Sequence, residues 1–188
     1  MLNFTHLLIA LSVLMPEAQA RRHSQKVRVE QDRSSEMQLT SPPQDNETCF
    51  APDEACTAKL IKFILSEKNS LDIAIFELTD RKIAEAIVEV AKKSKVRMIV
   101  NRKLVKDEGP AYDLIKASPA EIRVGRQRGI MHDKFTVVDK KRLETGSFNY
   151  TYAAGNSNQE NQIYLSTPNL VSRFNARFEQ MWKEAKTH

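Results

Sequence analysis

Residues 132 to 149 constrain this chain most, because they join a run of strand-forming residues to polar residues at fixed spacing. The segment reads HDKFTVVDKKRLETGSFN. Its Phe, Thr and Val residues at positions 135–138 favour an extended strand. Residues two apart in a strand point to the same face, so His132 and Lys134 are predicted to project together. That pair suits attack on a phosphodiester, because imidazole can act as nucleophile or acid while an ammonium group neutralises phosphoryl oxygens.

The polar positions of this segment also match a known signature. His132, Lys134 and Asp139 stand at H-x-K-x-x-x-x-D spacing, and after six intervening residues Gly146 begins G-S-x-N. The pattern resembles the HKD motif of the phospholipase D superfamily, whose members cleave phosphodiester bonds through a phosphohistidine intermediate.

The chain is similar in particular to the small single-motif members, the Nuc-type bacterial endonucleases. In those proteins a glutamate follows the asparagine of the motif in an Asn-x-Glu-Asn context, and residues 158–161 of this chain read NQEN. The likeness runs from about Cys49 to the C-terminus. It implies a phospholipase D-like α/β sandwich, in which a mixed β-sheet is flanked by helices.

Hydrophobic periodicity independently predicts alternating helices and strands, which is typical of an α/β fold with a mixed sheet. Apolar residues at helical spacing predict helices, and short β-branched runs predict strands. The predicted helices cover residues 54–68, 80–93, 109–117 and 168–185, and the predicted strands cover 71–76, 96–100, 121–124, 134–139, 142–147 and 163–165.

The N-terminal region differs in composition from the rest of the chain. Residues 7–15 form a short apolar run, Pro16 follows it, and residues 18–20 supply an A-x-A cleavage site. Residues 1–20 are therefore predicted to be a signal peptide that directs export to the periplasm or the medium. Because its first residues include His6 but neither Lys nor Arg, an uncleaved membrane anchor remains the alternative.

Residues 21–48 are polar and rich in charge, which predicts a flexible tether before a single domain at 49–188. Only two cysteines occur, Cys49 and Cys56. Export would make a disulfide between them plausible, with two reduced thiols as the alternative. Two cysteines without nearby histidines are a poor zinc site.

A single motif raises a question of stoichiometry, because in-line displacement needs a nucleophile and an acid on opposite sides of phosphorus. Of the four histidines, only His132 is well placed. The others, His6, His23 and His188, lie in the signal, the tether and the last position. The resemblance therefore implies a homodimer in which each subunit contributes one His132 to a shared site.

The resemblance also assigns roles to the surrounding residues. Lys134 and Asn149 would hold the phosphoryl oxygens, and Glu160 would accept a hydrogen bond from the imidazole of His132. Ser147 would contribute a hydroxyl near the phosphate or support its loop.

Two further positions of the motif are interpreted as structural. Gly146 would permit a close backbone approach, and Asp139 would lie on the strand face opposite His132. No carboxylate cluster suits a catalytic metal, so neither a metal nor another cofactor is expected.

The substrate is expected to be nucleic acid, with DNA first and RNA as a second candidate. The formal net charge of +5 favours an anionic partner, although charge alone leaves nucleic acid and anionic membrane equally open. Arg123, Arg126 and Arg128 could contact phosphates upstream of His132. The alternatives are phospholipid hydrolysis, for which the sequence shows no apolar loop tip near the site, and a nucleic-acid-binding protein that has lost catalysis.

Overall fold

The computed structural model of the protein describes residues 42–107, 109–125 and 129–187. The chain divides into two units, Met1–Thr40 and Ser41–His188, and the described residues all belong to the second. The predicted signal peptide and most of the predicted tether therefore lie outside the described residues. In the part of the chain that is described, no helix combines the length and the apolar character that crossing a membrane requires.

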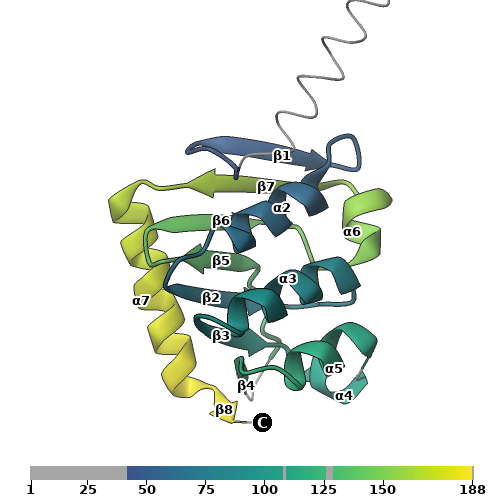
Figure 1. Cartoon of the computed structure of the whole chain (residues 1–188), viewed down its shortest axis with the longest axis vertical. Coiled ribbons are helices and arrows are strands. Elements are labelled where there is room, and N and C mark those ends of the chain that lie inside the picture. Colours follow the sequence, from purple (N-terminus) through teal and green to yellow (C-terminus); the bar gives the residue numbers. More distant parts are fainter. Residues whose placement is uncertain (1–41, 108, 126–128, 188) are drawn as a thin grey trace, which may run out of the picture. The chain divides into compact units, whose positions relative to one another are not determined.

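One eight-stranded sheet runs through the second unit in the order β1-β7-β6-β5-β2-β3-β4-β8 (Figure 1). Strands β2, β3 and β4 are parallel, and the other pairings are antiparallel. The predicted mixed sheet is thus confirmed. The strands are β1 (Glu47–Ala51), β2 (Ser70–Ile75), β3 (Lys95–Val100), β4 (Glu121–Val124), β5 (Phe135–Val138), β6 (Arg142–Gly146), β7 (Glu160–Leu165) and β8 (Lys186–Thr187).

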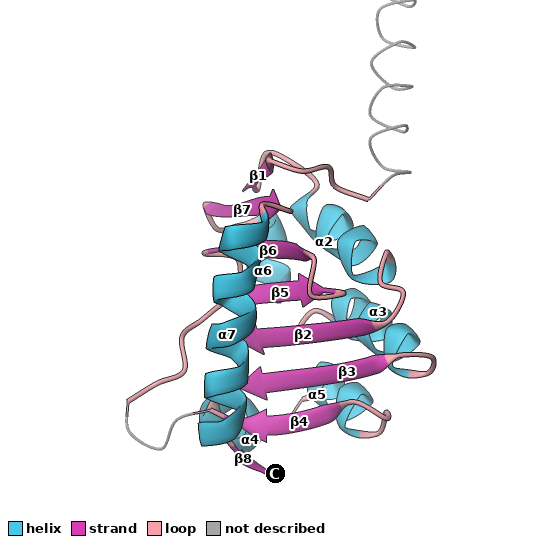
Figure 2. Cartoon of the chain, turned by 90° about the vertical axis from the view of Figure 1, so that its left-hand side faces the viewer, coloured by secondary structure: helices cyan, strands magenta, loops and turns pink. Residues whose placement is uncertain are grey.

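Helices cover both faces of this sheet, as a sandwich requires (Figure 2). Helices α2, α3 and α5 pack on one face and α7 packs on the other, and each layer has its own cluster of buried apolar side chains. The helices are α2 (Cys56–Leu65), α3 (Arg81–Ala91), α4 (Arg102–Asp107), α5 (Pro110–Lys116), α6 (Tyr152–Asn156) and α7 (Pro168–Glu184).

Helix α3 illustrates why these segments form where they do. Asp80 caps its N-terminus, accepting hydrogen bonds from the backbone N–H groups of Lys82 (2.8 Å) and Ile83 (3.2 Å). Ile83, Ile87 and Val90 recur at helical spacing and are fully buried. The cap and the apolar stripe both indicate a helix here, and the predicted helix at 80–93 is confirmed. It begins one residue later and ends two residues earlier than predicted.

An ion cluster around the buried Arg97 joins α7 to the sheet. The guanidinium of Arg97 donates from Nε to Asp72 Oδ1 (2.7 Å) and from an Nη atom to Glu179 Oε1 (2.7 Å). It also lies 4.8 Å from the ring centroid of Phe178. Burial lowers the pKa of Arg97, but the hydrogen bonds to the two carboxylates outweigh burial and raise it above its ordinary value.

Four short elements have no counterpart in the sequence prediction, namely β1, α4, α6 and β8. Strand β1 begins at Glu47, so two residues assigned to the tether belong to the sheet. Each of these elements is six residues or shorter. Such segments contain too few residues to show a period and depend on contacts with distant parts of the chain.

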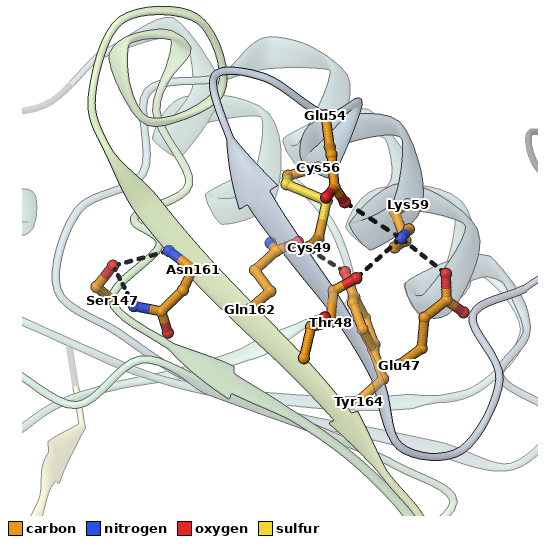
Figure 3. The surroundings of a disulfide bond; sticks show 10 residues. All are labelled: Glu47, Thr48, Cys49, Glu54, Cys56, Lys59, Ser147, Asn161, Gln162 and Tyr164. Carbon is orange, nitrogen blue, oxygen red and sulfur yellow. Dashed lines mark hydrogen bonds and ion pairs between the residues drawn. A yellow bond between two sulfur atoms is a disulfide. The ribbon is translucent and has the colours of Figure 1, made fainter. Parts of the chain in front are cut away.

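A disulfide joins Cys49 on β1 to Cys56 at the start of α2 (Figure 3). Beside it, the ammonium of Lys59 lies 2.7 Å from Glu47 Oε1 and donates to the carbonyl of Thr48 (3.1 Å). Together these contacts tie the edge strand β1 to the helix layer.

Candidate active site

His132 and Lys134 lie side by side in the segment that leads into β5, which begins at Phe135. His132 is exposed, whereas Lys134 is 8% exposed. The Nζ atom of Lys134 lies 3.3 Å from Nδ1 and 3.4 Å from Nε2 of His132, and it donates to the His132 carbonyl at 3.0 Å. Sequence spacing alone predicted this pairing of imidazole and ammonium.

Phe76 and Glu77, at the end of β2, complete this side of the site and were not predicted. The ring of Phe76 packs 4.5 Å from the imidazole of His132, measured between centroids. Lys134 Nζ lies 5.2 Å from the same phenyl ring. Only the sheet register reveals this neighbourhood: Ala74 pairs with Phe135 in the antiparallel β2–β5 ladder, so the residues after Ala74 run beside those before Phe135.

The charge of Lys134 is balanced by three acidic side chains. Burial lowers the pKa of Lys134, and attraction to Glu160, Asp133 and Glu77 acts in the opposite direction. The net pKa lies below the ordinary lysine value. The site therefore surrounds one partly desolvated cation with carboxylates from three separate segments.

Gly146 and Ser147 close the other side of the site, where β6 meets β7. A Cβ atom at Gly146 would lie 2.1 Å from the backbone oxygen of Asn161, so only glycine permits this close approach. Ser147 Oγ accepts a hydrogen bond from the Asn161 backbone N–H at 3.1 Å (Figure 3). The Ser147 N–H donates to the Asn161 carbonyl at 3.1 Å. Of the two predicted roles for Ser147, these contacts favour loop support.

Glu160 occupies a different position from the one predicted. Its carboxylate accepts hydrogen bonds from the Ser147 hydroxyl and from Asn158 Nδ2 (3.2 Å). Among the described residues it makes no hydrogen bond to the imidazole of His132. The hydrogen bond from Ser147 holds the Glu160 carboxylate at the junction of β6 and β7, where Gly146 pairs with Gln162. Glu160 belongs to the site through its attraction to Lys134 and its support of the Ser147 loop.

Asn149 is half-buried between Phe148 and Tyr150, which are both fully buried. Its Oδ1 atom is buried and makes no hydrogen bond within the described part of the protein. A buried amide oxygen is normally satisfied. The Asn149 oxygen is therefore not committed to holding the fold. Contact with phosphoryl oxygens would use the Nδ2 group instead, because an amide oxygen only accepts hydrogen bonds.

Asp139 has a structural role at the β5–β6 turn, where it adopts a positive φ of 55°. Its carboxylate accepts hydrogen bonds from the backbone N–H groups of Lys68 (3.2 Å), Asn69 (2.8 Å) and Ser70 (3.1 Å). Partial burial raises the pKa of Asp139, but these donors outweigh it and lower the pKa below the ordinary value. The motif aspartate thus fixes the hairpin to the start of β2.

The predicted phosphate contact by Arg123 is not supported. Its guanidinium donates to the Trp182 carbonyl (2.7 Å) and lies 4.2 Å from the Trp182 ring centroid. Packing of α7 on β4, which the sequence pattern does not show, occupies this side chain. Arg126 and Arg128 lie outside the described residues.

Buried polar side chains on β5 and β6 lie next to the segment that carries Asn149, and the sequence did not predict them. Thr136 and Glu144 are cross-strand partners, and Thr136 hydrogen-bonds to the hydroxyl of Tyr150, the residue that follows Asn149. Glu144 is 1% exposed. Burial raises the pKa of Glu144 to about 8, although a hydrogen bond from Tyr150 acts to lower it.

Among the described residues, side chains of metal-ligand type gather at Cys49, Glu54 and Cys56. The two sulfur atoms of that group are bonded to each other, so they do not offer thiolate ligands. The group also contains neither His132 nor Lys134.

Comparison with known proteins places this geometry in a family. Residues 60–182 match the family described as "Cardiolipin synthase, PLD-like domain". A mitochondrial cardiolipin hydrolase of Mus musculus is 29% identical over 138 residues, covering 72% of this chain and 62% of that protein. A phospholipase D of Rickettsia conorii is 29% identical over 128 residues, covering 68% and 64%. The chain thus spans less than two thirds of the length of either relative.

Solved structures share the fold over nearly their whole length. The phospholipase D family member Nuc from Salmonella typhimurium superposes with a TM-score of 0.69 at 26% identity, covering 76% of this chain and 96% of Nuc. NucT from Helicobacter pylori gives a TM-score of 0.68 at 23% identity, covering 77% of this chain and 99% of NucT.

Proposed function

This chain belongs to the phospholipase D superfamily, and we propose from that premise that it is a metal-independent phosphodiesterase that cleaves DNA, with RNA as a second candidate. The observation that carries the proposal is the contact between an exposed imidazole and a buried ammonium. Lys134 Nζ lies within 3.4 Å of both ring nitrogens of His132. A phosphodiester that reaches the imidazole would therefore place its oxygens beside a positive charge.

In the proposed reaction, an imidazole nitrogen of His132 attacks phosphorus and forms a P–N bond. The bond from phosphorus to the leaving oxygen breaks, and that oxygen takes a proton from a second imidazole. Water then attacks the phosphohistidine, gives its proton to the second imidazole and releases His132. Lys134 and Asn149 hold the phosphoryl oxygens in both steps.

The second imidazole is proposed to come from a second copy of the chain. An imidazole cannot stand on both sides of phosphorus, and within the described residues His132 is the one histidine. A homodimer with a two-fold axis near the site would bring the two motifs together.

A mixed dimer of wild type and His132→Ala is therefore expected to be inactive, although it contains one intact motif. Random pairing of equal amounts should leave about a quarter of the activity, whereas independent sites would leave about half. The measurement is the rate after co-refolding of tagged subunits, with dimer composition checked by mass. Full activity in a monomer, identified by light scattering, would contradict the shared site.

Two observations support nucleic acid as the substrate. The formal net charge of the chain is +5, and electrostatic attraction supplies most of the non-specific affinity for nucleic acids. The sequence resembles the Nuc-type endonucleases, and the structural match to Nuc from Salmonella typhimurium covers 96% of that protein.

Phospholipid hydrolysis is the alternative function, because one apolar side chain is exposed beside the site. Ile130, two residues before His132, is 64% exposed, although the sequence alone indicated no apolar loop tip. Exposed apolar side chains beside a catalytic histidine would suit contact with a lipid surface. The relative from Mus musculus carries the name cardiolipin hydrolase.

Cleavage is expected to persist in excess EDTA, with a rate within about twofold of the untreated enzyme, because no metal is needed to activate the nucleophile. The assay offers the chelated protein plasmid DNA, RNA, and vesicles of phosphatidylcholine or cardiolipin in parallel. Cleavage of DNA or RNA supports the proposal, and cleavage of lipid alone supports phospholipid hydrolysis. Loss of activity in EDTA with recovery on adding Mg²⁺ would show a metal-dependent reaction instead.

We also propose that the protein is exported. The disulfide between Cys49 and Cys56 supports this, because structural disulfides persist mainly in oxidising compartments. Cell fractionation with a thiol-alkylation assay on each fraction tests it, and a reduced protein confined to the cytoplasm would argue against export.

A further inference from the structure

A pocket of about 470 Å³ lies between the first turns of α2 and α3 and helix α6. Its wall includes Thr57, Arg81, Lys82, Tyr152 and Asn156. Pockets that hold small ligands typically measure about 300–1,000 Å³. None of these residues has a role in the proposed reaction.

The pocket is joined to the active site by two backbone segments. The N–H groups of Thr79 (2.8 Å) and Asp80 (2.9 Å) both donate to the Tyr150 carbonyl, and the Tyr150 N–H donates to the Glu77 carbonyl (3.0 Å). The first segment runs from Phe76, which packs on His132, to Arg81. The second runs from Asn149 to Tyr152, a stretch that spans at most about 11 Å.

Tyr152 presents an aromatic ring at this pocket. It is the first residue of α6 and is 70% exposed. Two contacts hold helix α6 in place. Thr151 caps the helix by accepting a hydrogen bond from the Ala154 N–H at 3.1 Å. Gly155 packs closely on α2, since a Cβ atom at this position would lie 2.2 Å from Thr57 Oγ1. The exposed ring therefore stands on a fixed support.

Two cations stand on the α3 side of the pocket. Arg81 and Lys82 are both exposed. Arg81 pairs with Glu85 (2.8 Å), but both side chains are more than half exposed, so this pair is weak enough to exchange for a phosphate. Asp80 also lines the pocket, but its carboxylate is engaged as the α3 cap and is only 8% exposed.

We infer that this pocket binds one unpaired nucleotide next to the scissile phosphate, with its base stacked on Tyr152 and its phosphate beside Arg81 and Lys82. The inference rests on the proposed function and adds a substrate subsite to it. Aromatic rings combined with cations along one groove are the usual means of holding single-stranded nucleic acid. A base in a duplex is already stacked on its neighbours, so the site selects for unpaired strands.

The test compares a short single-stranded oligonucleotide with bis(p-nitrophenyl) phosphate, a diester without a flanking nucleotide. Tyr152→Ala is expected to lower kcat/KM for the oligonucleotide about tenfold, mainly through KM, and to leave the small diester unchanged. Tyr152→Phe should retain the wild-type rate because it keeps the ring. Phe50→Ala is the matched control, since Phe50 is another exposed aromatic residue (53%) and is not part of the pocket.

The role of the pocket cations is tested by two substitutions in α3. Arg81→Ala should weaken oligonucleotide cleavage and reduce its dependence on salt. Lys92→Ala is its control, because Lys92 forms a comparable exposed pair with Glu89 at the other end of α3. Equal effects of both substitutions would mean that general charge, and not the pocket, binds the strand.

Binding of the oligonucleotide to the His132→Ala protein is measured by fluorescence anisotropy. This measurement separates the proposed phosphodiesterase function from the proposed nucleotide subsite. If wild type cleaves neither substrate but Tyr152→Ala still weakens binding, the proposed function fails and the subsite stands. If cleavage occurs and Tyr152→Ala changes neither binding nor kcat/KM, the subsite is refuted. It is also refuted if the protein binds no oligonucleotide, or if Tyr152→Ala impairs only the cleavage of lipid vesicles.

Discussion

Replacing His132 by alanine is expected to lower phosphodiester cleavage by about 10⁴-fold or more, equivalent to about 5.5 kcal/mol of barrier, while the protein stays folded. The imidazole is the proposed nucleophile in one subunit and the proposed acid in the other, so one substitution removes both groups. Because His132 is exposed, its removal leaves no cavity in the core.

Circular dichroism and thermal unfolding would verify the fold of the His132→Ala protein, and gel filtration its assembly. Lys140→Ala, on the exposed turn of the same hairpin, is the matched control and should retain activity. A His132→Ala rate within about tenfold of wild type, or about 1.4 kcal/mol, would exclude His132 as the nucleophile.

The second large effect concerns Glu144 and the dependence of stability on pH. Its folded-state pKa of about 8 exceeds the ordinary value of 4.5. Between those values the folded protein retains a proton that the unfolded chain has lost, so the free energy of unfolding falls as pH rises. Each pKa unit corresponds to about 1.4 kcal/mol, which sets an upper limit of about 5 kcal/mol across the window.

Glu144→Gln is expected to remove this decline, because an amide of the same shape does not ionise. Relative to wild type, the variant should gain stability steadily as pH rises from about 4.5 to about 8. Urea unfolding at several pH values measures the difference, with Glu89→Gln on the exposed face of α3 as control. Parallel stability curves for wild type and Glu144→Gln would show that Glu144 does not titrate in this range.

Local sequence signals predicted the parts of the fold that local physics determines. The α3 segment carries its own cap at Asp80 and its own apolar stripe, so its position was evident without knowledge of its neighbours. Strand β1 has no such signal: it is a strand because β7 offers hydrogen-bonding partners to it. Short elements of this kind depend on tertiary context.

The residues of the candidate site likewise divide into those that local sequence predicts and those that depend on tertiary contacts. His132 and Lys134 are two residues apart, and their contact follows from spacing alone. Phe76 could be placed only through the register of β2 with β5. The availability of Arg123 to a phosphate depends on its contact with Trp182 of α7, which is 59 residues away in the chain.

The hydrogen bonds that join the residue 77–80 segment to Tyr150 involve backbone atoms alone. Main-chain groups are the same for nearly all amino acids, so these bonds do not depend on the side chains that face the pocket. Substitutions at Arg81, Lys82 or Tyr152 can therefore change what the pocket binds while His132 and Lys134 keep their positions. Such an arrangement separates the chemistry of cleavage from the choice of substrate, which allows one fold to diversify in evolution and makes those three positions a natural target for a combinatorial library.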